Sequence, residues 1–300
     1  MSILNMPSDG LFNVAVVLVR ALVRFGPRPR DELLLSCGFG VDAIDPAQLT
    51  RTLNRWTELG LFAAEGAMVT LREPYRAELG KAPDIAERRL PKVMRMIALA
   101  PENNLRFWEA EENKSADLSR GLSWILAQDV YTLDTGSHSK IQALEAKQVA
   151  DKSRCMLQND TRWNGLRTWM IYLGFARGGP QVTVDPTHAL REALPDIFGD
   201  ERVLPARVFV DRVAQALPVF DSGAYRRQVE GTLTGPSWTP PPDGMLSTSF
   251  SRAIKRLDHE GLVAAEQRSD TEDGVSLVGA NQRRWRRMTH VRRILDDKGE

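Results

Sequence analysis

A recurring pattern of apolar positions predicts three copies of one small unit along the chain. In each copy an amphipathic helix ends at a glycine (Gly60, Gly174 or Gly261), and a short strand follows at once. Each helix is therefore expected to bury a large side chain one turn before a left-handed glycine cap and to pass directly into a half-buried strand. The apolar residues four positions before and one position after each glycine are Trp56 and Leu61, Met170 and Phe175, and Leu257 and Leu262.

Shorter helices precede and a hairpin follows the glycine-capped helix in each copy. In the first copy Asp45 and Pro46 predict the start of that helix, because aspartate caps a helix and proline suits its first turn. In the third copy the strand 262–265 is predicted to pair with 275–278 across a polar loop. We therefore predict a mainly α fold with small β-hairpins, built as tandem winged helix-turn-helix domains.

The copies and the segments between them predict the domain boundaries. Trp285, Met288, Val291 and Ile294 follow one another at near-helical spacing, which predicts a final helix. The predicted parts are winged-helix domain 1 over 1–80, a helical linker over 81–114, a winged-helix-like domain 2 over 115–200, winged-helix domain 3 over 201–282, and a basic C-terminal helix or tail over 283–300.

Composition restricts the environment and the chemistry of the chain. The 40 Lys and Arg residues balance the 39 Asp and Glu residues, so any attraction to nucleic acid must come from a local patch. The two cysteines, Cys37 and Cys155, are too few for a disulfide framework or a four-thiolate metal site. No apolar run reaches the length that spans a bilayer. These features indicate a reduced, cytoplasmic protein with no membrane partner.

Sequence motifs for catalysis are missing from the chain. It has no phosphate-binding loop, nucleophile elbow, His-Glu-x-x-His or Cys-x-x-Cys, and its four histidines are scattered. We therefore expect no enzyme activity, catalytic residue, cofactor or metal.

Polar residues on the glycine-capped helices are the candidates for DNA contact, since in a DNA-reading winged helix this helix enters the major groove. Arginine and asparagine suit bidentate contacts with base edges. The densest positive charge lies in residues 283–300, which hold seven basic and three acidic residues. The predicted DNA-binding residues are Arg51, Asn54 and Arg55 in the first copy, Arg162 and Arg167 in the second, Arg252, Lys255 and Arg256 in the third, and Arg283, Arg284, Arg286 and Arg287 near the C-terminus.

The opening of the chain, MSILNMPSDGLFNV (Met1–Val14), resembles the start of DpdG-like proteins. These are components of the bacterial Dpd cluster, which places 7-deazaguanine derivatives in DNA and restricts foreign DNA, including phage DNA. The resemblance implies a role in an anti-phage defence system beside ATPase, helicase and nuclease-like proteins. It carries over no catalytic residue.

Together these observations predict a non-enzymatic accessory protein of an anti-phage defence or DNA modification and restriction system. It is expected to bind DNA, an enzyme partner such as an ATPase, or both. One alternative is a sequence-specific transcriptional regulator, which needs a symmetric dimer and a defined operator. A second is a scaffold subunit whose winged helices bind only protein, and a third is a nuclease with a dispersed site.

Overall fold

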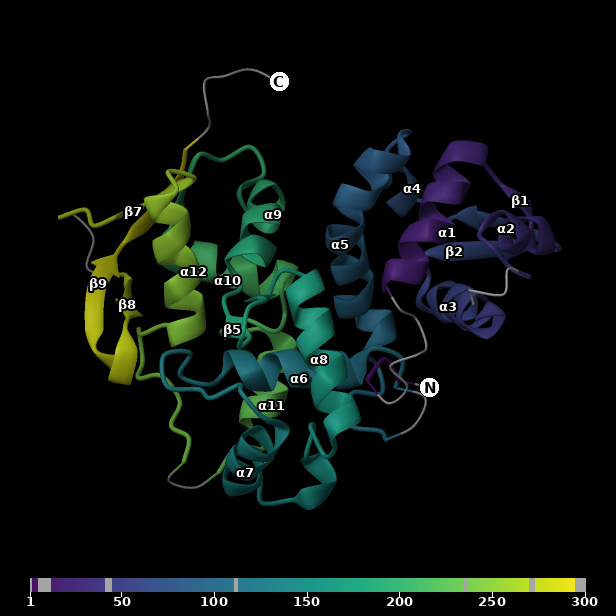
Figure 1. Ribbon diagram of the computed structural model, residues 1–300. Helices are drawn as coiled ribbons and strands as arrows, with labels where there is room; N and C mark the ends of the chain where they lie inside the picture. The colour runs from purple at the N-terminus through teal and green to yellow at the C-terminus, as the bar shows by residue number, and fades with distance from the viewer. Residues whose placement is uncertain are drawn as a thin grey trace. The chain divides into compact units, whose positions relative to one another are not determined.

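The computed structural model describes residues 2–4, 12–40, 45–110, 113–234, 237–269 and 273–294. The chain divides into two compact parts, which we call unit 1 (1–118) and unit 2 (119–300). Each is mainly helical with small antiparallel sheets (Figure 1), which confirms the predicted fold class at this level. None of the helices in the described part of the chain is both long enough and apolar enough to cross a membrane.

Unit 1 is a helical layer with one three-stranded antiparallel sheet in the order β1-β3-β2. Helix α5 belongs to the segment predicted as a linker, but it packs along α1 and α4 and buries Leu90, Met94 and Ile97 in the core of unit 1. The elements are α1 (Phe12–Phe25), β1 (Arg28–Pro29), α2 (Arg30–Ser36), α3 (Pro46–Leu59), β2 (Phe62–Glu65), β3 (Met68–Leu71), α4 (Tyr75–Leu79), α5 (Pro83–Leu99) and the 3₁₀ helix η1 (Pro101–Asn103).

The described residues of unit 2 form three small antiparallel sheets, β4-β5, β6-β10-β7 and β8-β9. Its first helix, α6, starts at the end of unit 1. The elements are α6 (Ala116–Leu126), α7 (His138–Gln148), η2 (Lys152–Arg154), α8 (Asp160–Tyr172), β4 (Ala176–Arg177), β5 (Thr183–Val184), α9 (Thr187–Phe198), β6 (Val203–Pro205), α10 (Ala206–Ala216), α11 (Ala224–Glu230), α12 (Thr248–His259), β7 (Val263–Glu266), β8 (Val275–Val278), η3 (Ala280–Gln282), β9 (Arg284–Met288) and β10 (His290–Arg293).

Local sequence signals set both ends of α3. The Asp45 carboxylate accepts a hydrogen bond from the Ala47 amide at 2.9 Å, and Pro46 occupies the first helical position. At the other end Gly60 takes a left-handed φ of 102°. Its amide donates to the Thr57 carbonyl at 3.1 Å, which is one of the two bonds of a Schellman motif. The predicted start and end of this helix are confirmed.

The same turn ends α8 and α12, at Gly174 (φ 83°) and Gly261 (φ 73°). The amide of the residue after each glycine donates to a carbonyl in the last turn of the helix. The carbonyl of this same residue accepts from an amide just after the returning strand. The predicted alignment of the three glycines is therefore confirmed as one hydrogen-bonded turn. The first set of bonds is Leu61 to Trp56 at 2.8 Å, Phe175 to Met170 at 2.8 Å and Leu262 to Leu257 at 3.0 Å; the second is Arg72 to Leu61, Asp185 to Phe175 and Ile294 to Leu262, each at 3.0 Å.

Two of the three copies also share the order of the strands in their sheets. Unit 1 runs α1-β1-α2-α3-β2-β3, and unit 2 runs α9-β6-α10-α11-α12-β7 and then β10. In both sheets the last strand lies between the first and the second, as β1-β3-β2 and β6-β10-β7. Unit 2 has one additional helix, α11, before the glycine-capped helix. The copies also differ in what joins the last two strands, which is a two-residue turn in unit 1 and the segment 267–289 in unit 2.

Two sequence expectations about this segment are wrong. Strand β7 pairs with β10 rather than with β8, and β8 pairs with β9. Residues 284–293 form strands rather than a helix. Met288 and Val291 are both buried, but a break at Thr289 separates their strands and shifts the alternation of buried positions. The resulting three-residue spacing imitates helical periodicity.

Three phenylalanines, one of them on α12, form a buried cluster in unit 2. Phe250 lies 6.3 Å from Phe209 and 5.1 Å from Phe220 between ring centroids, and all three side chains are almost fully buried. Helix α9 packs against both α10 and α12 and extends this core. The cluster therefore holds α12 in place through its apolar face.

Candidate nucleic-acid interface

The predicted arginine run lies on an exposed ribbon inserted between β7 and β10. We call Arg283, Arg284, Arg286 and Arg287, together with Trp285, the arginine ribbon; all five residues are exposed. Strand β8 supports it, because Val275, Leu277 and Val278 are buried and the Val278 amide donates to Ser251 Oγ of α12 at 2.9 Å. Figure 1 shows β8 and β9 alongside α12. The apolar strand anchors the ribbon, and the basic strand faces solvent.

A β-bulge places Trp285 at the middle of the ribbon. Leu277 pairs with Arg286 and Val278 pairs with Arg284, so Trp285 is the extra residue between two pairs. Its side chain is 45% exposed. The ammonium of Lys255, on α12, lies 3.6 Å from the centre of the indole ring, within the range of a cation–π contact. The sequence assigned Trp285 to a buried helical stripe, whereas the structure presents it at the surface.

The basic residues near the ribbon differ in how far neighbouring carboxylates neutralise them. Arg292 and Arg268 donate to the Glu266 carboxylate, at 2.6 and 3.0 Å, and these hydrogen bonds hold the pKa of Glu266 below its usual value. Arg286 pairs with Asp258 at 3.1 Å. Within the described part of the chain the guanidiniums of Arg283 and Arg284 have no hydrogen bond or ion pair. These two residues therefore carry the least compensated positive charge of the ribbon.

The predicted arginines of α12 make contacts inside unit 2. Arg252 donates to the Val184 carbonyl at 2.9 Å and lies over the ring of Tyr131. Arg256 pairs with Asp185 at 3.3 Å. The Asp185 side chain is 1% exposed and also pairs with Arg177 of β4 at 2.9 Å. Of the three predicted residues on this helix, only Lys255 joins the arginine ribbon, through Trp285.

Replacing Arg256 by alanine is expected to lower the free energy of unfolding of unit 2 by about 1–2 kcal/mol, because the buried Asp185 carboxylate loses one of its two cations. The half-exposed guanidinium makes this cost smaller than that of breaking a fully buried pair. Arg284→Ala is the matched control, and it should change stability by no more than about 0.5 kcal/mol. Denaturant unfolding of both variants measures the difference. If Arg256→Ala loses no more stability than this control, the Arg256 side chain does not support the fold.

The first turn of α12 is covered by other parts of unit 2. The Thr248 hydroxyl accepts from the Val130 amide at 3.0 Å, Ser249 donates to the Leu126 carbonyl at 2.7 Å, and Ser251 bonds to β8 as described above. All three side chains are buried. This turn would have to be open to enter a major groove by the usual docking of such a helix.

The predicted residues on α3 and α8 are divided between exposed and buried positions. Arg51 and Asn54 are exposed, and Asn54 Oδ1 accepts from Arg30 of α2 at 2.7 Å. Arg55, expected on the exposed face, is 3% exposed and reaches Glu58 at 3.4 Å. Arg162 is also buried (8% exposed) and donates to the Met156 carbonyl at 3.3 Å, while Arg167 is half-buried. Long side chains can bury their aliphatic stems, which the polar pattern of a helix does not reveal.

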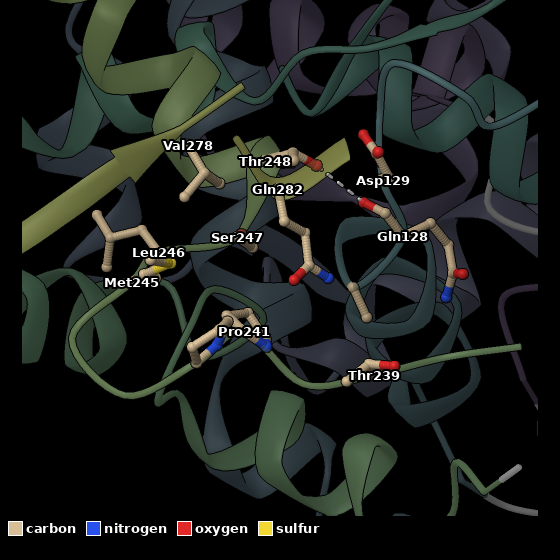
Figure 2. Close-up of a pocket in the computed structure, with 12 residues that line it drawn as sticks. Gln128, Asp129, Thr239, Pro241, Met245, Leu246, Ser247, Thr248, Val278 and Gln282 are labelled. Carbon is tan, nitrogen blue, oxygen red and sulfur yellow. Dashed lines mark hydrogen bonds between the residues drawn. The ribbon is translucent and has the colours of Figure 1, made fainter. Parts of the chain in front are cut away.

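A small cavity lies between the 127–129 segment, the loop 239–246 that contains Pro241 and Pro242, and the start of α12 (Figure 2). Its volume is about 30 Å³, which is room for about two water molecules. In Figure 2 Gln282 points into it, and Thr248 bonds to the Gln128 carbonyl at 3.3 Å. An open groove of about 480 Å³ shares the 127–129 wall and continues past Lys147 and Trp238.

These elements define a mainly helical protein that has small antiparallel sheets and carries an arginine-rich β-ribbon. The family model of DpdG-like proteins matches residues 1–271 of the 300. The chain belongs to the DpdG-like family, which confirms the resemblance and extends it far beyond the first fourteen residues. This membership associates the protein with the Dpd modification and defence cluster, a multi-protein system. No curated protein and no solved structure matches the chain.

Proposed function

We propose that this chain is a non-enzymatic, DNA-binding accessory protein of the Dpd system. The observation that carries the proposal is the arginine ribbon, where two guanidiniums that pair with no carboxylate among the described residues adjoin an exposed tryptophan. Arginine clusters of this kind bind phosphate and release the counterions that surround DNA. The ribbon would supply the local positive patch that the balanced overall charge requires.

We further propose that the α1–β3 and α9–β10 segments are winged-helix domains in tandem. Support comes from the matching strand orders β1-β3-β2 and β6-β10-β7 and from the helix-strand-helix start of both segments, with α11 as an extra helix in the second. In this interpretation the segment 267–289, which carries the arginine ribbon, is an enlarged wing, because it is inserted where unit 1 has a two-residue turn. Winged domains contact the DNA backbone through their wings, so an arginine-rich wing is a natural phosphate contact.

The proposed DNA contact is made by the wing of unit 2 rather than by α12. The covered first turn of α12 and the internal contacts of Arg252 and Arg256 leave little of this helix for base recognition. Binding through the wing alone would depend on phosphate and salt and little on sequence. An accessory subunit that couples DNA to an enzyme partner, such as an ATPase, needs no more than this. A sequence-specific regulator would need an open recognition helix.

The test is the double variant Arg283→Glu with Arg284→Glu, assayed by fluorescence anisotropy on a labelled DNA duplex. We expect at least about a tenfold loss of affinity near 0.1 M salt, and a fall of about two units in the slope of log affinity against log salt. Arg286 is left in place because a glutamate there would face Asp258 across the contact that now holds an ion pair.

The matched control is Lys147→Glu with Lys152→Glu, which makes the same change in net charge on exposed residues of α7 and η2. It should keep most of the wild-type affinity and salt slope. If both double variants bind DNA as the wild type does, the ribbon does not bind DNA and a scaffold that contacts only protein becomes the better description. A protected palindrome in a footprint would instead favour the transcriptional regulator.

A further inference from the structure

We propose that the arginine ribbon binds single-stranded DNA and that Trp285 is the platform on which an unpaired base stacks. This inference rests on the proposed function, since it names the form of DNA that the same surface holds. Aromatic side chains in basic surroundings are the recurring means of binding unpaired bases, because every base presents a stackable face.

The surroundings of the indole ring prepare it for this contact. The bulge pushes Trp285 out of the β8–β9 pairing, and its side chain stays 45% exposed although the ribbon packs on α12. Lys255 covers one face of the ring at 3.6 Å and holds it against the helix. A base would therefore have to stack on the opposite face of the ring, which Lys255 leaves free. A ring that is already held loses little conformational entropy when a base stacks on it.

The flanking guanidiniums complete the site. Arg284 and Arg286 lie on the two sides of Trp285, and residues two apart on a strand are about 7 Å from each other along the chain. Arg284, which pairs with no carboxylate among the described residues, can contact a phosphate on one side of a stacked base, with Arg283 next to it. Arg286 lies on the other side and adds charge there while it remains paired with Asp258. In a duplex the base faces are covered by their neighbours, so the indole could add nothing to binding there.

The experiment compares Trp285→Ala and Trp285→Phe with the wild type on two labelled probes, an oligothymidylate and a duplex of the same length. Trp285→Ala should weaken oligothymidylate binding by about 5- to 100-fold, the loss expected for one stacked base. Its duplex affinity should change less than about twofold, and Trp285→Phe should restore most of the oligothymidylate affinity because phenylalanine also stacks. Thermal unfolding confirms that both variants are folded.

The control is Phe25→Ala, which removes an aromatic side chain of unit 1 that is 51% exposed and lies under the guanidiniums of Arg24 and Arg28. It should leave both affinities unchanged. The inference is overturned if Trp285→Ala binds oligothymidylate as the wild type does, if it weakens both probes equally, or if Phe25→Ala gives the same loss. A normal Trp285→Ala variant beside a defective Arg283→Glu, Arg284→Glu variant would reject stacking while the proposed DNA binding stands.

Discussion

The Gly174→Ala variant should lose about 2 to 5 kcal/mol of the free energy of unfolding of unit 2. The glycine has a φ of 83°, and an L residue in this region costs about 1–2 kcal/mol. A Cβ there would also lie 2.9 Å from the Ala189 amide nitrogen and 2.8 Å from a ring carbon of His188. The backbone of α9 cannot move aside cheaply, so overpacking adds about 1–3 kcal/mol.

Gly261 provides the matched control for this variant, because it ends α12 of the same unit with the same turn. Its φ is 73°, but a Cβ at this position would meet nothing within 4 Å. Gly261→Ala should therefore show only the backbone cost, about 1–2 kcal/mol. Urea unfolding of the two variants measures the difference. If both lose the same amount, the close approach of α9 to the Gly174 turn contributes nothing.

The Phe250→Ala variant should lose about 3–5 kcal/mol, the usual cost of removing a fully buried aromatic ring. Phe250 contacts both Phe209 and Phe220, so the vacated space is lined by rings that cannot fill it without moving α10 and the turn that follows it. The loss should appear as a lower denaturant midpoint with an unchanged slope, since the unfolded surface is nearly the same.

Val208 of α10 is the control for this second variant, because it is 37% exposed on a helix that also contributes Phe209 to the cluster. Val208→Ala should change stability by no more than about 0.5 kcal/mol. A loss below about 1.5 kcal/mol for Phe250→Ala would mean that the cluster is not the main support of α12.

The parts of the fold that the sequence predicts well are those decided within a few residues. The cap at Asp45 and the turns at Gly60, Gly174 and Gly261 depend on neighbours within about one turn of helix, and all are present in the structure. The pairing of β7 with β10 is different, because the whole segment 267–289 separates the two strands. Local alternation shows that β8 is a strand but does not identify its partner.

The candidate interface also has parts that the local sequence predicts and parts that depend on distant contacts. The arginine run is visible in the sequence, and so is its tryptophan. The bulge that exposes Trp285 depends on the pairing of β9 with β8, which no local pattern reveals. Arg256 looked available because its partner Asp185 is distant in the sequence and follows a different hairpin. A surface arginine and an arginine that holds a buried carboxylate have the same sequence signature.

Strands β7 and β10, which flank the segment 267–289, determine where this protein can tolerate change. His290 pairs with Glu266, so the two ends of the 267–289 excursion meet side by side on the framework of unit 2. Additions, losses or exchanges within the excursion need not stretch the strands that anchor it. If the ribbon binds nucleic acid as we propose, its preference could diversify at this one site while the α-helical body of unit 2 is inherited unchanged.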